Sequence, residues 1–392
     1  MPISPELTLS RIPTLLDAVE SPEDLAEYSH FRHELPRSAR PLTPIADYPQ
    51  TALPVSTRSL LEWHGSAAYE AAFDAFRDYP ERSLCREIDR VLLYHLVRSL
   101  RPEHVVEIGT YFAAGTEVLA RALWECGTGT LHTADPYGKI RCPSLLARWE
   151  DRLRAHVRFY PWNSMELFQH LGERQTQLDL AFIDGNHDFE FALFDLQAAS
   201  KLMRPGGVIV MDDANQSGPF WASKVFLDQN PGWSELGNCL ALAKSNDPFG
   251  PVPTLFPGSK FLLLHAPREI HVGELPFSTG QVAFDGTQLT GLEFELPPQQ
   301  HGEVQGRIFL RGFPTGERPE QIETLFRLSL RGETSATLRL KQPVRTRRAG
   351  DSPRPRQTVE VVLLWQPERG SESLKLIRPP TPLTTSALPT PD

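Results

Sequence analysis

Short apolar segments alternate with helical patterns between residues 84 and 211, and this alternation constrains the fold more than any other feature of the chain. Apolar residues recur at helical spacing over 84–100 and lead into the first apolar run, Val105-Val106. Strands separated by helices of this length predict right-handed βαβ units, whose parallel strands form a sheet covered on both faces. We therefore predict an α/β fold with a doubly wound, Rossmann-like, mostly parallel sheet.

The same pattern locates the individual elements. The predicted strands are 105–107, 129–135, 157–160, 178–183 and 207–211, and the predicted helices are 84–100, 116–125, 144–154, 164–171 and 189–202. Two later apolar runs, Trp233–Leu236 and Lys260–His265, are predicted to pair antiparallel at the sheet edge.

The chain changes character on either side of this region, which we expect to form a domain over 79–266. Residues 1–78 mix short helical patterns with proline-containing loops and predict a helical and irregular appendage. Over 267–378 apolar residues alternate with polar ones between Gly- and Pro-containing turns, which predicts an all-β domain, a sandwich or jelly roll. Residues 379–392, rich in proline and threonine, predict a disordered tail.

Composition narrows the class of protein. At 392 residues the chain is long enough for two or three domains, and its formal charge of −9 argues against a general nucleic-acid binder. The four cysteines form no CxxC pair, which favours free thiols in a reducing compartment over a disulfide framework. Neither a secretion signal nor an apolar run of membrane-spanning length is found, so we expect a cytoplasmic protein that does not enter a membrane.

Polar residues follow each predicted strand of the central sheet. They are Glu107, Asp135, Asn163-Ser164, Asp184 with His187, and Asp212-Asp213. In a doubly wound sheet ligands bind outside the carboxyl ends of the strands, so these side chains predict a site at one edge. The first strand continues into a loop with Gly109 and Gly115, which is neither a Walker loop nor a strict GxGxxG and by itself fits a plain βα turn equally well.

Four motifs together resemble a known family. VVEIGTY at 105–111, Asp135 after a strand, FIDGNHDFE at 182–190 and LMRPGGVIVMDD at 202–213 are similar to class I S-adenosylmethionine-dependent methyltransferases. The resemblance is strongest to the small-molecule O-methyltransferase branch and covers about 84–266.

The resemblance implies roles for the residues of the first three strand ends. Glu107, Gly109 and the loop Ala113–Gly115 would hold the methionine part of S-adenosyl-L-methionine, and Asp135 would bind its ribose. Asn163 and Ser164 would lie near the adenine. The chain departs from the family at Ala113, where glycine is common, and this departure bears on cofactor binding and catalysis more than on the fold.

The resemblance also implies a metal site. Asp184, Asp212 and Asp213 stand where related enzymes bind a divalent cation, and carboxylates suit Mg²⁺. Such an ion would lower the pKa of a substrate hydroxyl, and His187 or Asp184 would take its proton. The alternative is that these acids only fix their own turns, as in metal-free relatives.

The sequence thus predicts a methyltransferase that acts on a hydroxyl of a small molecule or sugar. Two alternatives stay open: a non-catalytic Rossmann-like binding or scaffold protein, and a metal-using, hydroxylase-like relative on the same fold. The all-β domain could bind glycan, mediate homodimer formation or act as a lid. Its basic loop, Lys341–Arg356, is either a patch for an anionic partner or a solvated loop.

Overall fold

The computed structural model describes residues 40–46, 48–81, 83–238, 258–268, 277–284, 288–296, 301–310, 314–315, 318–319, 323–331, 334–344, 357–367 and 381–385. Contacts divide the chain into two compact units, Met1–Val272 and Gly273–Asp392. Cys239, the N-terminal 39 residues and most of the basic loop lie outside the described residues.

A seven-stranded sheet forms the centre of the first unit, in the order β3-β2-β1-β4-β5-β7-β6. Its strands are β1 (His104–Ile108), β2 (Thr130–Ala134), β3 (Val157–Tyr160), β4 (Leu178–Ile183), β5 (Met203–Met211), β6 (Ser234–Asn238) and β7 (Leu262–His265). Strands β1 to β5 are parallel, and β7 runs antiparallel to both β5 and β6. The predicted α/β fold and the predicted edge pair are confirmed.

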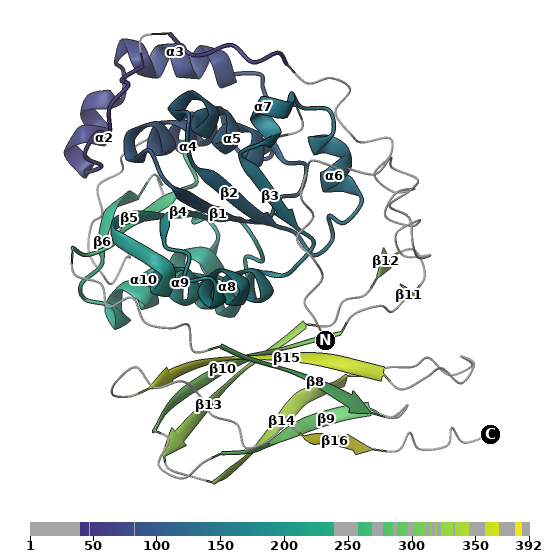
Figure 1. Ribbon diagram of the computed structural model, residues 1–392. Coiled ribbons are helices and arrows are strands. Elements are labelled where there is room, and N and C mark those ends of the chain that lie inside the picture. Colours follow the sequence, from purple (N-terminus) through teal and green to yellow (C-terminus); the bar gives the residue numbers. More distant parts are fainter. Residues whose placement is uncertain are drawn as a thin grey trace. The chain divides into compact units, whose positions relative to one another are not determined.

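Helices cover both faces of this sheet. They are α2 (Thr57–Trp63), α3 (Ala67–Phe76), α4 (Glu87–Leu100), α5 (Ala114–Cys126), α6 (Arg141–Leu146), α7 (Asp151–Arg154), α8 (Ser164–Glu173), α9 (Phe189–Leu202) and α10 (Ser217–Gln229). Helices α4 and α5 lie on one face, and α8, α9 and α10 lie on the other (Figure 1).

Burial explains why these segments form a sheet covered on both sides. Val105, Val106, Leu180 and Ala181 are fully buried although neighbouring side chains on a strand point to opposite faces. A fully buried valine or leucine stabilises the fold by about 1.5–3 kcal/mol relative to an exposed one. The helices α2 and α3 add Leu60 and other apolar side chains to the same core.

Three helices differ from the prediction. The helix predicted over 144–154 is two helices, because Glu150 is extended and its carboxylate accepts the amide of Leu42, 2.9 Å away. Helices α2 and α10 were not predicted. The start of α10 reads Ser217-Gly218-Pro219, which resembles a loop, yet proline is tolerated in the first turn of a helix.

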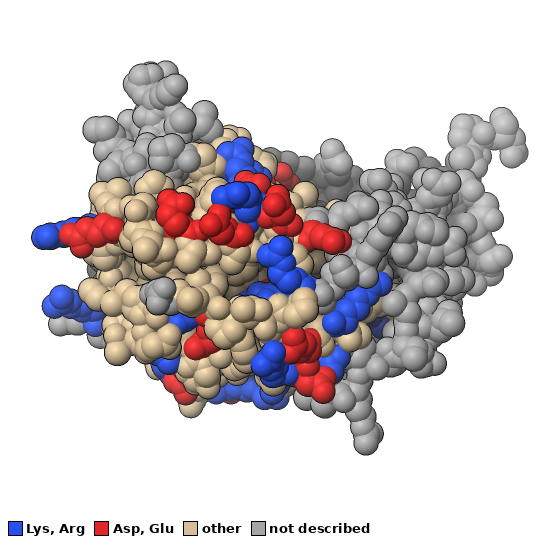
Figure 2. Space-filling view, turned by 90° about the horizontal axis from the view of Figure 1, so that it is seen from above, with Lys and Arg blue, Asp and Glu red and all other residues tan. Residues whose placement is uncertain are grey.

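The face of the molecule seen in Figure 2 carries charges of both signs. Acidic and basic side chains lie next to one another over the described part of the face in Figure 2. No helix in the described ranges is long and apolar enough to cross a membrane. Three of the cysteines, Cys85, Cys126 and Cys142, are buried free thiols.

The second unit consists of antiparallel strands. Its strands are β8 (Phe277–Phe284), β9 (Gln288–Glu295), β10 (His301–Leu310), β11 (Pro314–Thr315), β12 (Arg318–Pro319), β13 (Glu323–Arg331), β14 (Ser335–Val344), β15 (Gln357–Pro367) and β16 (Thr381–Thr385). They form a four-stranded sheet, β13-β10-β15-β8, a three-stranded sheet, β14-β9-β16, and the pair β11-β12. Leu292, Phe294 and Leu296 are buried, which confirms the period-two pattern of an all-β region there.

The tail prediction is wrong for residues 381–385. They form β16, which pairs with β9, because main-chain hydrogen bonds to a neighbouring strand satisfy a segment whose composition alone predicts disorder. The remainder of 379–392 lies outside the described residues.

Candidate functional site

The candidate site lies at the switch point of the sheet, where β1 has β2 on one side and β4 on the other. Gly109 ends β1 with a left-handed backbone, φ 96°, and a Cβ at this position would overlap the carbonyl oxygen of Asp184. The amide of Asp184 in turn donates to the carbonyl of Ile108 over 2.9 Å. Only glycine therefore lets the loop after β1 rest against the end of β4.

The loop between β1 and α5 carries two left-handed residues that are not glycine, Tyr111 (φ 45°) and Ala113 (φ 58°). A left-handed conformation costs an ordinary residue about 1–2 kcal/mol, which explains why glycine suits position 113. Gly115 has a packing reason of its own, since a Cβ there would lie 2.7 Å from the carboxylate of Glu107.

Glu107 is enclosed beneath this loop, 1% exposed. Its Oε2 accepts hydrogen bonds from the hydroxyls of Thr116 and Thr133, each 2.6 Å away. Burial raises the pKa of Glu107 to about 7, and the two hydroxyls limit that rise. Glu107 thus ties the start of α5 to β2.

Asp135, at the end of β2, is held by several donors. Its Oδ2 accepts from the amide of Tyr111 and from the guanidinium of Arg141, and its Oδ1 accepts from the amide of Tyr137, each over 2.8 Å. Arg141 also lies over the rings of Tyr111 and Phe112. Asp135 and Arg141 therefore form a buried ion pair that fixes the shape of this side of the site.

The polar residues after β3 are also engaged. Asn163 is the N-cap of α8, where its side chain accepts the amide of Glu166 over 3.0 Å and the Glu166 carboxylate accepts the amide of Asn163. The hydroxyl of Ser164 donates to Asp195 over 2.6 Å. Both side chains thus have structural partners at the place predicted for the adenine.

Two carboxyl groups meet at the ends of β4 and β5. Asp184 and Asp212 share a hydrogen bond, and burial raises the pKa of Asp184 to about 7 and that of Asp212 well above its ordinary value. Two adjacent carboxylates repel when both are charged, which adds to the shift at Asp212. Asp212 is 4% exposed, and its Oδ1 has no hydrogen-bond partner among the described residues.

Asp213 has partners of its own. It is left-handed, with φ 46°, and its Oδ1 lies 2.8 Å from the ammonium of Lys260. Its Oδ2 lies 3.4 Å from Nδ1 of His187, whose Nε2 lies 3.3 Å from Asp184. The structure therefore brings Asp184, His187 and Asp213 together as a chain that ends at Lys260, and not as three ligands around one point.

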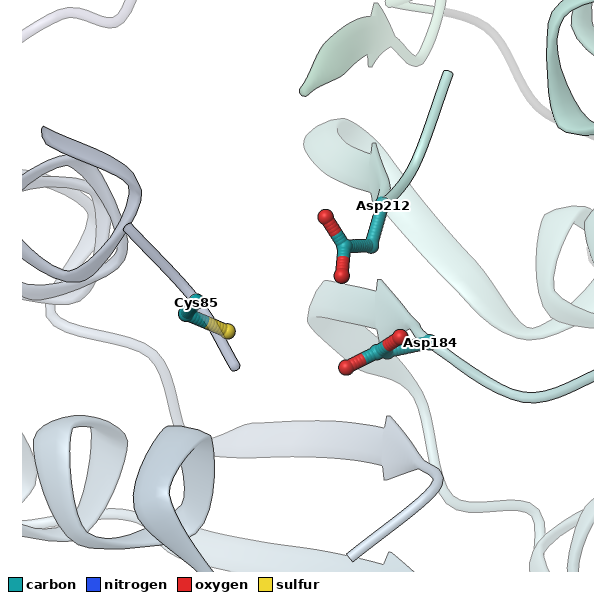
Figure 3. A group of neighbouring side chains, drawn as sticks. All are labelled: Cys85, Asp184 and Asp212. Carbon is teal, nitrogen blue, oxygen red and sulfur yellow. The ribbon is translucent and has the colours of Figure 1, made fainter. Parts of the chain in front are cut away.

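Cys85 lies beside the two acids Asp184 and Asp212. Its Sγ and one carboxylate oxygen each of Asp184 and Asp212 lie within 4.8 Å of one another. Figure 3 shows the thiol facing the two carboxylates. Neither Cys85 nor Lys260 was a predicted site residue, because nothing in their neighbouring sequence indicates that they approach the strand ends.

Comparisons with known proteins found one family model and several similar solved structures. Residues 106–214 match the family model described as Methyltransferase domain, and no curated protein matches the chain. Similar solved structures include the O-methyltransferase TomG from Streptomyces achromogenes in complex with SAM, at 20% identity over 52% of this chain and 91% of that one, TM-score 0.36. An O-methyltransferase from Bacillus cereus in complex with SAH is 20% identical over 53% and 90%, TM-score 0.37. Rv0187 from MTB, bound to cofactor, is 22% identical over 52% and 89%, TM-score 0.36.

Proposed function

We propose that the protein transfers a methyl group from S-adenosyl-L-methionine to a hydroxyl oxygen of a small molecule or sugar, because residues 106–214 match the family model described as Methyltransferase domain. The observation that carries this proposal is the extent of the match. It runs from β1 to just beyond β5 and so contains Glu107, Asp135, Asp184, His187 and Asp213, the polar groups that end the central strands.

The first half of the site supports cofactor binding. S-adenosyl-L-methionine supplies an electrophilic methyl group on a positively charged sulfur. Gly109 and the loop Ala113–Gly115 leave little side chain between the backbone and a ligand, so they would hold the methionine part together with Glu107 beneath them. Asp135, oriented by Arg141, would accept ribose hydroxyls, and Asn163 with Ser164 would border the adenine.

The second half supports removal of a proton from the acceptor. His187 lies between two carboxylates, at 3.3 Å from Asp184 and 3.4 Å from Asp213. Asp213, itself held by Lys260, would fix the orientation of the imidazole, and either His187 or Asp184 would accept the proton of the reacting hydroxyl. Orientation of two reactants in a closed site supplies much of the rate enhancement of such a displacement.

A divalent cation fits part of this half. When bound, it supplies a Lewis acid that lowers the pKa of a hydroxyl group. Asp184 and the unpaired oxygen of buried Asp212 would hold it, whereas the carboxylate of Asp213 is engaged by Lys260 and His187. Metal assistance is therefore proposed through Asp184 and Asp212.

Calorimetry with S-adenosyl-L-methionine tests the cofactor, with and without Mg²⁺. Binding is expected, and no binding in either condition would sink the proposal. A panel of catechols, phenols and sugars then tests the reaction, with S-adenosylhomocysteine and the methylated product detected by mass spectrometry. His187→Ala should lose about 100-fold or more of any activity found, while the matched variant at exposed His64, His64→Ala, should keep it. Cofactor binding without product on any acceptor would favour the non-catalytic alternative.

A further inference from the structure

Three side chains from separate parts of the chain converge beside the proposed catalytic residues. Cys85 belongs to the segment before α4, Asp184 follows β4 and Asp212 follows β5. We propose that Cys85 is a third protein ligand, with Asp184 and Asp212, of a cation site that takes a borderline-soft transition metal such as Zn²⁺ in preference to Mg²⁺.

An unpaired buried oxygen indicates that the site lacks a partner. Asp212 is 4% exposed, and its Oδ1 has no hydrogen-bond partner within the described ranges. Leaving a buried acceptor without a partner costs about 1–3 kcal/mol. Figure 3 shows that the carboxylates of Asp212 and Asp184 both face the sulfur of Cys85. A cation between them would supply the missing partner of Asp212.

The charge around the thiol also favours a cation. The acids Asp212, Asp184, Asp89 and Glu107 act electrostatically on the buried thiol of Cys85, so the charge around it is negative. A divalent ion would reverse this balance, because a coordinating thiol gives up its proton to solvent and binds as thiolate.

The ligand set distinguishes between metals. Thiolate is a soft ligand that suits zinc and cobalt, whereas Mg²⁺ takes oxygen ligands. The oxygen set predicted for Mg²⁺ is incomplete here, since Asp213 is held by Lys260 at 2.8 Å. One sulfur and two carboxylates leave a fourth position open, as in catalytic zinc sites.

The distances require only a small adjustment. The three ligand atoms lie within 4.8 Å of one another. Around a tetrahedral zinc ion, with bonds of about 2.0–2.3 Å, neighbouring ligand atoms lie roughly 3.5 Å apart. Rotation of the Cys85 and Asp184 side chains that moves their ligand atoms by about 1 Å would bring the three atoms to these distances. The side chain of Asp184 is 25% exposed, so an ion can reach the site from solvent.

This inference rests on the metal assistance in the proposed function and refines it. Its test therefore measures something other than activity. The full chain is titrated with Co²⁺ under reducing conditions, and the thiolate-to-cobalt charge-transfer absorption in the near ultraviolet is monitored. The band should form with the wild type and with Cys126→Ala, the matched change at another buried free thiol. It should be lost with Cys85→Ala, and Zn²⁺ affinity should fall about 100-fold or more, since even outer partners of a metal site are worth 10–100-fold.

Two further measurements keep the outcomes distinct. Asp212→Asn should weaken Co²⁺ binding as well, and thermal unfolding of each variant shows whether it folds. A missing band in folded wild type, a band that persists in Cys85→Ala, or Mg²⁺ binding as tight as Zn²⁺ binding would each overturn the inference. Calorimetry on the same preparations measures the binding of S-adenosyl-L-methionine, and so tests the proposed methyltransferase function independently of the metal site.

Discussion

The two halves of the site treat their carboxylates in opposite ways. In the β1–β2 half, Asp135 accepts two amides and a guanidinium, and Glu107 accepts two threonine hydroxyls. In the β4–β5 half, Asp184 and Asp212 share a hydrogen bond, and one oxygen of Asp212 has no partner in the described part of the chain. The carboxylates of the first half therefore have their partners within the protein, whereas one buried carboxylate oxygen of the second half has none among the described residues.

This difference separates an acid that has a buried cationic partner, such as Asp135, from an acid that repels a neighbouring acid, such as Asp212. Removal of an acid should destabilise the protein where that acid has a buried cationic partner, and should stabilise it where the acid repels its neighbour. The four predictions below test that contrast.

The largest effect is expected at Asp135. Asp135→Ala leaves the guanidinium of Arg141, 3% exposed, without its partner and should lower the free energy of unfolding by about 3–5 kcal/mol. The double variant Asp135→Ala/Arg141→Met should recover most of that loss in urea denaturation, because it removes both charges. Calorimetry should still find no binding of S-adenosyl-L-methionine to the double variant. Wild-type binding by the refolded double variant would show that Asp135 does not hold the ribose.

A smaller effect is expected from the titration of Glu107. Its pKa rises from an ordinary 4.5 to about 7 on folding, so the folded state binds more protons than the unfolded state between these values. The free energy of unfolding must therefore fall as the pH rises from about 4.5 to about 7, and it must recover as the pH is lowered again. Glu107→Gln should reduce the fall in the free energy of unfolding between pH 5 and pH 8 by about 2–3 kcal/mol. An unchanged fall would mean that the carboxyl is ionised and well solvated in the folded protein.

Asp212→Asn should act in the opposite direction to Asp135→Ala. Because burial and the neighbouring Asp184 raise the pKa of Asp212, its replacement by a neutral amide should raise the free energy of unfolding of the metal-free protein by about 1–2 kcal/mol at pH 8. Urea denaturation in EDTA measures this gain. If the variant is less stable than the wild type under these conditions, the two halves of the site do not differ as described.

The smallest effect is expected at Ala113. Ala113→Gly removes the strain of a left-handed alanine but adds backbone freedom to the unfolded chain and loses a buried methyl group, so stability should change by less than about 1 kcal/mol. Ala113→Val, a β-branched residue at the same φ of 58°, should lower the free energy of unfolding by roughly 2 kcal/mol. Equal stability of the two variants would show that the loop can leave the left-handed conformation.

Local patterns predicted the sheet and the groups that end its strands. Burial on both faces makes strands such as β1 and β4 readable as apolar runs, and the acid after each run follows from its position. The partners of those acids could not be predicted in this way. Arg141 reaches Asp135 through a tertiary contact, and Lys260 and Cys85 approach the site from segments distant along the chain. Their roles depend on folded geometry that no spacing rule encodes.

Local sequence patterns also gave wrong helix predictions where a tertiary contact outweighed the local preference of the chain. Glu150 interrupts a predicted helix because its carboxylate binds the amide of Leu42. Gly218 reads as a breaker, yet α10 starts there because the missing side chain lets the helix pack on the carbonyl of His187. The sequence shows the glycine at 218, but only the fold shows the carbonyl group of His187 that lies against it.

Gly109 connects the two halves mechanically. Its Cα rests against the carbonyl oxygen of Asp184, and the Asp184 amide bonds the residue before it. Neither backbone can shift far without pushing or pulling the other. A displacement of the loop after β1 would therefore displace the end of β4, which carries Asp184, and the absence of a side chain at Gly109 is what makes this contact possible.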